Sequence, residues 1–197
     1  MRILILVIWI LIPLGALAYH LGPGQHNMQR DHAAQLLADA DALVAKQDWA
    51  AAQPLFEKAL ELLPDDEVAV QRRVRLERAK CQLENKQLPD ANEDLKILVN
   101  ELASDKTASP ELLAESRAAL ANSQYYITWL MRLEGLPRDK WEPEITASQQ
   151  LYRLLAEQAV EMNDEVLIET RKKDLESAVK LARLDLGELQ GLPLPNQ

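Results

Sequence analysis

The sequence of 197 residues is poor in the residues that make turns, sheets and covalent cross-links. It contains one cysteine, one phenylalanine and six glycines, and aromatic residues make up only 5% of the chain. Runs in which Val, Ile and Thr alternate with polar residues are absent outside the N-terminus, which argues against a β-sheet. Alanine and leucine dominate instead, and both enter helices at little cost. We therefore expect an all-α protein with room for one domain.

The scarcity of thiols and the spacing of the histidines limit the metal chemistry of the chain. Cys81 has no second cysteine to pair with, so an intrachain disulfide and a cysteine-based zinc site are excluded. His20, His26 and His32 recur every six residues, whereas a helical metal pair needs a spacing of three or four. We predict a buried Cys81 and no metal site.

Positive charge is also in short supply, because the net charge is −9 and the isoelectric point is about 4.9. A domain this acidic repels nucleic-acid phosphates, so nucleic acid is not an expected partner. Two interpretations of the acidic surface stay open: it selects basic partners, or it only keeps a helical surface soluble. No Gly-rich phosphate loop, His-x-x-x-His or Gly-flanked serine is present, so we predict no catalytic residue and no cofactor.

One long hydrophobic run stands at the N-terminus. Residues 3–19 carry no charge and follow Arg2, an order that leaves the positive end in the cytoplasm and translocates the rest. Residues 1–21 are then a signal anchor whose apolar part, about 19 residues, just spans a bilayer. The alternative is a signal peptide that is cleaved near Ala18, after Ala16-Leu17-Ala18. The folded part is expected on the periplasmic or exoplasmic side, either membrane-anchored or, after cleavage, periplasmic or secreted.

The rest of the chain divides by composition into four parts. Residues 22–31 contain His, Gly and Pro and are expected to be a flexible spacer. Helical repeats are expected over 32–162, and a capping helix over 163–188. A disordered tail, rich in proline, is expected over 189–197.

The strongest repeat pattern consists of two predicted helices, 33–44 and 50–63. Each places apolar residues at steps of three and four along one face. This stretch resembles a tetratricopeptide repeat at Leu36, Ala40, Leu43, Asp48, Trp49, Ala52, Phe56, Ala59 and Pro64. Alanines at these positions let paired helices approach closely, while the aromatic side chains fill the remaining gaps.

Two weaker copies follow the first. Helices over 66–86 and 89–102 repeat the pattern at Leu76, Ala79, Gln87, Leu88, Ala91 and Leu95. A third pair over 110–134 and 143–162 is similar only in outline, and a helix over 164–186 has the polar outer side of a cap. The resemblance implies a right-handed superhelix of about three antiparallel helix pairs, a tetratricopeptide-like α-solenoid, with a C-terminal capping helix.

The same resemblance implies that the first helices of the pairs line a concave groove. The candidate partner-binding residues there are Arg73, Leu76, Lys80 and Leu83. Arg73 and Lys80 either receive a carboxylate of the partner or neutralise neighbouring glutamates of their own helix. The lysine- and asparagine-rich carboxylate clamp of chaperone-binding members is not reproduced.

A second candidate for partner binding is an aromatic pair. Tyr125 and Trp129 lie four residues apart and so share one face of a helix. Such residues are enriched at binding hot spots, but they also serve as core filler in a chain with few aromatics.

Taken together, the sequence predicts a non-catalytic scaffold outside the cytoplasm that binds a peptide or partner helix in its repeat groove. The alternative is a structural subunit of a larger membrane complex, held by the N-terminal transmembrane helix.

Overall fold

The protein is built from helices alone in the part that the structure describes. The computed structural model describes Trp9 and residues 23–190, and it contains no strand within those ranges. The all-α prediction is therefore confirmed. Apart from Trp9, the predicted signal or anchor segment lies outside the described residues, as does the tail from 191 to 197. Within the described part, none of the helices has both the length and the apolar character to cross a membrane.

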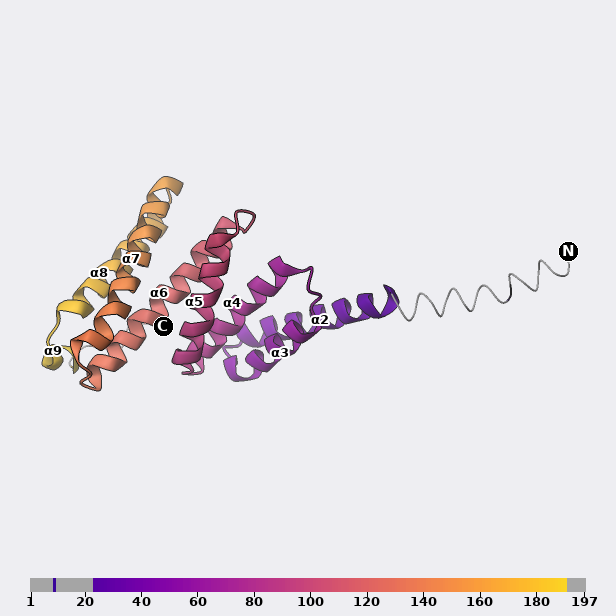
Figure 1. Ribbon diagram of the computed structural model, residues 1–197, viewed down its shortest axis with the longest axis horizontal. Coiled ribbons are helices and arrows are strands. Elements are labelled where there is room, and N and C mark those ends of the chain that lie inside the picture. Colours follow the sequence, from indigo (N-terminus) through magenta and orange to yellow (C-terminus); the bar gives the residue numbers. More distant parts are fainter. Residues whose placement is uncertain (1–8, 10–22, 191–197) are drawn as a thin grey trace. The chain divides into compact units, whose positions relative to one another are not determined.

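Eight helices follow one another along residues 23–190 (Figure 1). They are α2 (Pro23–Val44), α3 (Trp49–Leu62), α4 (Val68–Glu84), α5 (Leu88–Ser104), α6 (Pro110–Leu133), α7 (Arg138–Met162), α8 (Glu165–Arg183) and α9 (Leu186–Gln190). The chain divides into two compact units, Met1–Arg78 and Ala79–Gln197, and α4 crosses the division.

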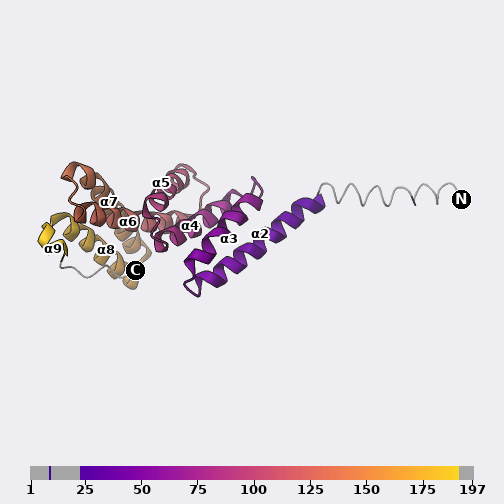
Figure 2. The same cartoon turned by 90° about the horizontal axis from the view of Figure 1, so that it is seen from below.

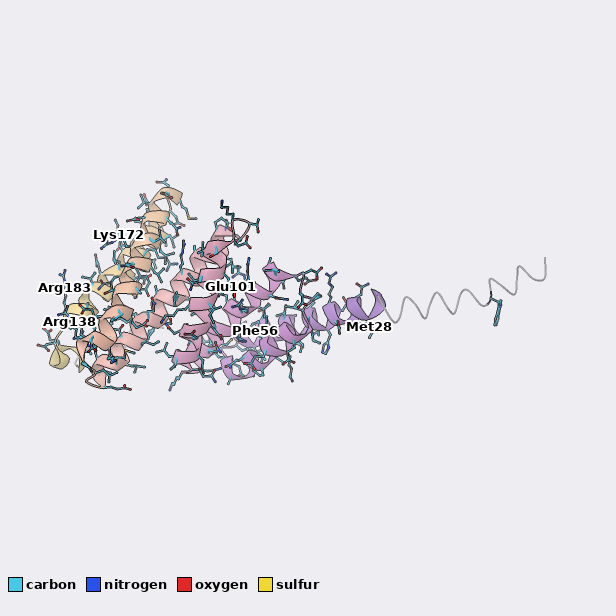
Figure 3. All side chains as sticks on the ribbon, viewed as in Figure 1. Met28, Phe56, Glu101, Arg138, Lys172 and Arg183 are labelled. Carbon is cyan, nitrogen blue, oxygen red and sulfur yellow. The ribbon has the colours of Figure 1, made fainter. Side chains whose placement is uncertain are left out.

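In the first unit, α2 and α3 pack against each other as the predicted pair. The turn between them is capped by Asp48, whose Oδ1 accepts a hydrogen bond from the backbone N–H of Ala51 at 3.2 Å. Four alanines (Ala33, Ala40, Ala52 and Ala59) are fully buried. Phe56, labelled in Figure 3, is 1% exposed beside them. As predicted, small side chains thus bring the helices close and an aromatic ring fills the space they leave.

The start of α2 differs from the expected spacer, because residues 23–31 are helical. Pro23 opens the helix, where its missing N–H costs no hydrogen bond, and no further glycine or proline follows Gly24 within α2. Arg30 ties this part of α2 to the segment before α4, with its Nε 2.6 Å from Oε1 of Glu67. A contact with a residue so distant in the sequence is not visible in local composition.

In the second unit, α5 packs on α6, α6 on α7 and α7 on α8, in chain order. Figures 1 and 2 show α6, α7 and α8 lying side by side. Together with α9 they enclose a core cluster of Ala121, Ile145, Tyr152, Leu155, Ala178, Leu181 and Leu189. Ser109 caps α6 by accepting a hydrogen bond from the N–H of Leu112 at 3.1 Å. Gly135 makes the α6–α7 turn with a φ of +72°, a conformation that favours glycine.

Two boundaries in this unit differ from the expected ones. Helix α7 begins at Arg138 and continues through Pro143, where the sequence predicts its start. An ion pair one turn apart, Arg138 to Glu142 at 2.6 Å, accompanies the added turn. At the other end, Leu189 is fully buried on α9, although the disordered tail was expected from this residue. Burial of one leucine side chain in a core formed by distant helices explains the added order.

Polar contacts between helices complete the second unit. Nδ2 of Asn92 donates to Oγ of Ser123 at 2.8 Å, which joins α5 to α6. Oγ of Ser148 donates to the carbonyl of Ala121, also at 2.8 Å, which joins α7 to α6. These buried bonds fix which faces of the helices meet, because a misplaced helix would leave polar atoms without partners.

The side chain of Arg132, on α6, binds the C-terminal end of α8. The guanidinium of Arg132 donates to the carbonyl oxygens of Leu181 and Leu184. It also lies 4.7 Å from the ring centroid of Trp141. Burial lowers the pKa of Arg132, and the nearby Asp185 opposes that shift. A positive charge at the C-terminal carbonyls of a helix also complements its dipole.

Candidate functional site

A polar hollow opens in the second unit where three alternate helices come together. Its volume is about 360 Å³. We call it the inner hollow, and it is lined by Lys80, Leu83 and Glu84 of α4, Glu115, Ala118, Ala119 and Asn122 of α6, Tyr152 of α7, and Arg171 and Asp174 of α8. The intervening helix α7 contributes only Tyr152, so most of the wall comes from α4, α6 and α8.

The sequence of α6 explains why space remains between these helices. Ala118 and Ala119 face the hollow, and a methyl side chain fills little of the volume between neighbouring helices. Serines and alanines elsewhere on α6, such as Ser116, Ala121 and Ser123, are buried against the neighbouring helices. Small residues thus hold α6 close to its neighbours on one side and leave it open on the other.

Two ion pairs lie in the walls of the inner hollow, one between two helices and one within a single helix. Nζ of Lys80 lies 2.5 Å from Oε1 of Glu115 and so connects α4 to α6. Nη1 of Arg171 lies 3.2 Å from Oδ2 of Asp174, one turn along α8. The side chains of these pairs are between 23% and 38% exposed, so solvent screens them partly and each is worth at most about 1 kcal/mol.

Tyr152 is the residue of α7 that lines the inner hollow. It is only 6% exposed, and no other described residue makes a hydrogen bond to its hydroxyl. Burial raises the pKa of Tyr152 well above its usual range, and the negative charge of Asp174 raises it further. The phenol is therefore neutral across the physiological range and retains both a donor and an acceptor.

A second tyrosine, Tyr126, lies close enough to Glu84 of the hollow to feel its charge. Burial raises the pKa of Tyr126, and the carboxylate of Glu84 adds to the shift. Its ring meets that of Tyr125 edge to face, with the centroids 5.6 Å apart.

The residues predicted for partner binding fall into different surroundings. Lys80 and Leu83 line the inner hollow. Leu76 is fully buried and offers no surface to a partner. Arg73 lies in the first unit, with its Nη1 3.4 Å from Oε1 of Glu77, which is the neutralising role that the sequence left open.

The aromatic pair belongs to the packing of the second unit. Tyr125 and Trp129 are half-buried against its core cluster. This placement favours the core interpretation of these two residues over the binding one, as the scarcity of aromatics suggested.

Sequence reasoning missed most of the polar lining: Glu84, Glu115, Asn122, Tyr152, Arg171 and Asp174. Glu84 carried a usable signal, since it lies one turn after Lys80 on the same face. Arg171 and Asp174 belong to the predicted capping helix, whose charged face the sequence assigns to solvent. A charged helix face has the same sequence pattern toward solvent and toward a polar hollow.

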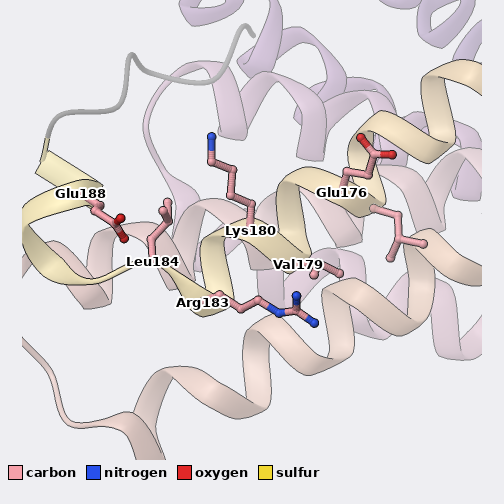
Figure 4. Close-up of a pocket in the computed structure, with 7 residues that line it drawn as sticks. Glu176, Val179, Lys180, Arg183, Leu184 and Glu188 are labelled. Carbon is pink, nitrogen blue, oxygen red and sulfur yellow. The ribbon is translucent and has the colours of Figure 1, made fainter.

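A second and larger hollow, of about 540 Å³, lies along α8 and the start of α9 (Figure 4). Leu175, Val179 and Leu184 give it an apolar wall. In Figure 4, the side chains of Lys180 and Arg183 leave the helix in opposite directions, so its charges do not converge on one point. The inner hollow has converging polar groups and is the better candidate site.

The inner hollow can hold a side chain of another molecule through ion pairing, hydrogen bonding and apolar contact at once. Nowhere in the described part of the chain, the inner hollow included, do three His, Cys, Asp or Glu side chains gather as metal ligands would. Comparisons of the chain with protein-family models, with curated proteins and with solved structures found no match.

Proposed function

We propose that the protein is a non-catalytic interaction scaffold and that the inner hollow is where it receives a protein or peptide partner. The observation that carries this proposal is the convergence of α4, α6 and α8 on one concave polar site, which the largely buried side chain of Tyr152 lines without a hydrogen-bond partner among the described residues. Buried polar groups normally have hydrogen-bond partners. A group without one in a concave site is suited to a ligand.

We also propose that the helices form the tetratricopeptide-like superhelix that the sequence pattern implies. The packing of α5 through α8 in chain order and the meeting of alternate helices at one hollow support this arrangement. In such a solenoid each pair contacts its neighbours, and the alternate helices supply a continuous binding surface.

The proposed location is the periplasmic or exoplasmic face of a membrane, with residues 1–21 retained as the anchor. This part rests on the uncharged run that follows Arg2. N-terminal sequencing of the protein purified from membranes tests it. A sequence beginning at Met1 or Arg2 supports the anchor, and one beginning near Tyr19 replaces it with a cleaved signal peptide.

The binding site itself is tested by site-specific photo-crosslinking of the full chain in its native membranes. A photoreactive amino acid is placed at Asn122, which is exposed and lines the inner hollow, or at Glu93, which is exposed on α5 and does not line it. We expect one protein to be captured reproducibly from position 122 and not from position 93. The purified partner must then bind the isolated full chain in detergent or nanodiscs.

The control position makes the outcome decisive. Capture of the same protein with equal yield from positions 93 and 122 would place the contact elsewhere or make it non-specific. A partner that is captured but does not bind the purified chain would also refute the inner hollow as its docking site.

A further inference from the structure

The inner hollow carries more negative than positive charge. Its lining contains two cationic side chains and three carboxylates. Lys80 is paired with Glu115 and Arg171 with Asp174. The remaining carboxylate, Glu84, makes no ion pair or hydrogen bond with another described residue. A further positive charge in the hollow would therefore meet an uncompensated negative one.

The largely buried side chain of Tyr152 supplies a second, independent indication of a ligand. This side chain is 94% buried, lines the hollow, and has no hydrogen-bond partner among the described residues. Its hydroxyl is therefore open to a ligand in the hollow, and the hydroxyl oxygen has two lone pairs to offer a donor. A cationic side chain is such a donor and carries no acceptor of its own.

The apolar part of the lining suits the stem of a long side chain. Leu83, Ala118 and Ala119 face the same space as the polar groups. Arginine and lysine have aliphatic stems that pack on apolar surface while the charged end reaches polar groups. Asn122 at the exposed edge adds an amide whose oxygen also accepts hydrogen bonds.

We propose that the inner hollow receives a basic side chain, arginine or lysine, from the partner, with its charge at Glu84 and Tyr152 and its stem on Leu83 and the alanines of α6. This inference rests on the proposed function, because it names the chemistry of the partner at that same site. It reverses one reading of the sequence, in which Lys80 receives a carboxylate of the partner. It agrees with one of the two interpretations of the acidic surface given by the sequence, namely that this surface selects basic partners.

The test uses the full chain in nanodiscs and three soluble peptides observed by saturation-transfer NMR. The peptides share a flexible glycine–serine backbone and differ only at one central residue: arginine, its neutral isostere citrulline, or glutamate. We expect the arginine peptide to bind about tenfold more tightly than the citrulline peptide, as one charge-assisted contact implies, and the glutamate peptide to bind most weakly.

Three variants assign that preference to the site. Glu84→Gln and Tyr152→Phe should each reduce the advantage of arginine over citrulline, with Glu84→Gln bringing it close to zero. Glu93→Gln removes the same charge from an exposed position outside the hollow and should leave the advantage unchanged. If the advantage survives in Glu84→Gln, or falls equally in Glu93→Gln, the proposal is wrong.

Failure of this proposal can be told apart from failure of the proposed function. Equal binding of all three peptides, lost in Asn122→Trp, would overturn the basic-side-chain proposal and leave the inner hollow as a peptide site. Absence of binding by every peptide would also overturn the basic-side-chain proposal. The docking role would then be decided by the crosslinking from position 122.

Discussion

Lys80 and Glu115 join α4 to α6 across the wall of the inner hollow, with Nζ and Oε1 2.5 Å apart. The two side chains are 34% and 38% exposed, which places them between a surface pair and a buried one. Such a pair adds little to stability but decides how much positive charge the wall presents. The interaction therefore bears more on ligand choice than on folding.

Replacement of Lys80 by methionine separates these two effects. We expect Lys80→Met to change the free energy of unfolding by no more than about 1 kcal/mol, because the pair is partly solvated. The same change removes one positive charge from the wall and should tighten binding of the arginine peptide by about threefold. Urea denaturation and peptide titration measure the two quantities. A large loss of stability, or weaker peptide binding, would contradict this account of the wall.

The hydrogen bond between Asn92 and Ser123 is expected to matter more for stability. Asn92 is 4% exposed and its amide donates to the serine oxygen at 2.8 Å. We expect Asn92→Ala to cost about 1–2 kcal/mol, since it breaks a buried hydrogen bond and leaves a small cavity. Asn100→Ala is the matched control, because Asn100 is exposed on the same helix.

A double-mutant cycle distinguishes a specific bond from general loss of packing at that site. Adding Ser123→Ala to Asn92→Ala should cost less than the sum of the single changes, with a coupling of about 1 kcal/mol. If the free-energy costs of the two single changes simply add, the hydrogen bond does not stabilise the packing of α5 against α6.

The cation at the end of α8 gives a third prediction. Arg132 donates to two backbone carbonyls and stacks on Trp141, so Arg132→Ala should lower the free energy of unfolding by about 2–3 kcal/mol. Arg153→Ala, an exposed change on α7, should stay within about 0.5 kcal/mol. Equal effects of the two substitutions in urea denaturation would refute the role of Arg132.

The pKa of Tyr152 leads to a prediction at high pH. Burial raises this pKa in the folded chain above the unfolded value of about 10. The folded state thus disfavours the ionised phenol, and the associated stability is complete below about pH 10 and is lost as the pH rises further. Tyr152→Phe should lose less stability than the wild type between about pH 9 and 11. Denaturation at a series of pH values measures this, and parallel curves would count against it.

The parts of the fold that depend on local sequence spacing could be predicted, and the parts that depend on distant contacts could not. Helix pairs follow from local spacing, as the buried alanines and Phe56 around the first turn demonstrate. Caps such as Ser109 are equally local and were predictable. The start of α2 was not, because Arg30 reaches Glu67 across many residues. Leu189 likewise becomes ordered through a core that other helices build.

The site was less predictable than the fold for a physical reason. Lys80 and Leu83 could be predicted from the sequence because the resemblance to a tetratricopeptide repeat implies that their helix lines a groove. Arg171 and Asp174 come from a helix that approaches the same space only after folding. A charged helix face does not by itself distinguish solvent from a polar hollow, so their role could come only from the packed structure.

The most direct test of the central claim is the affinity of the purified crosslinked partner for two tryptophan variants of the full chain. Asn122→Trp places a bulky ring at the mouth of the inner hollow, and Glu93→Trp places the same ring on an exposed part of α5. Thermal unfolding first confirms that both variants are folded. We expect Asn122→Trp to weaken binding at least about tenfold and Glu93→Trp to leave it unchanged. Wild-type affinity in Asn122→Trp would contradict the assignment of the inner hollow as the docking site.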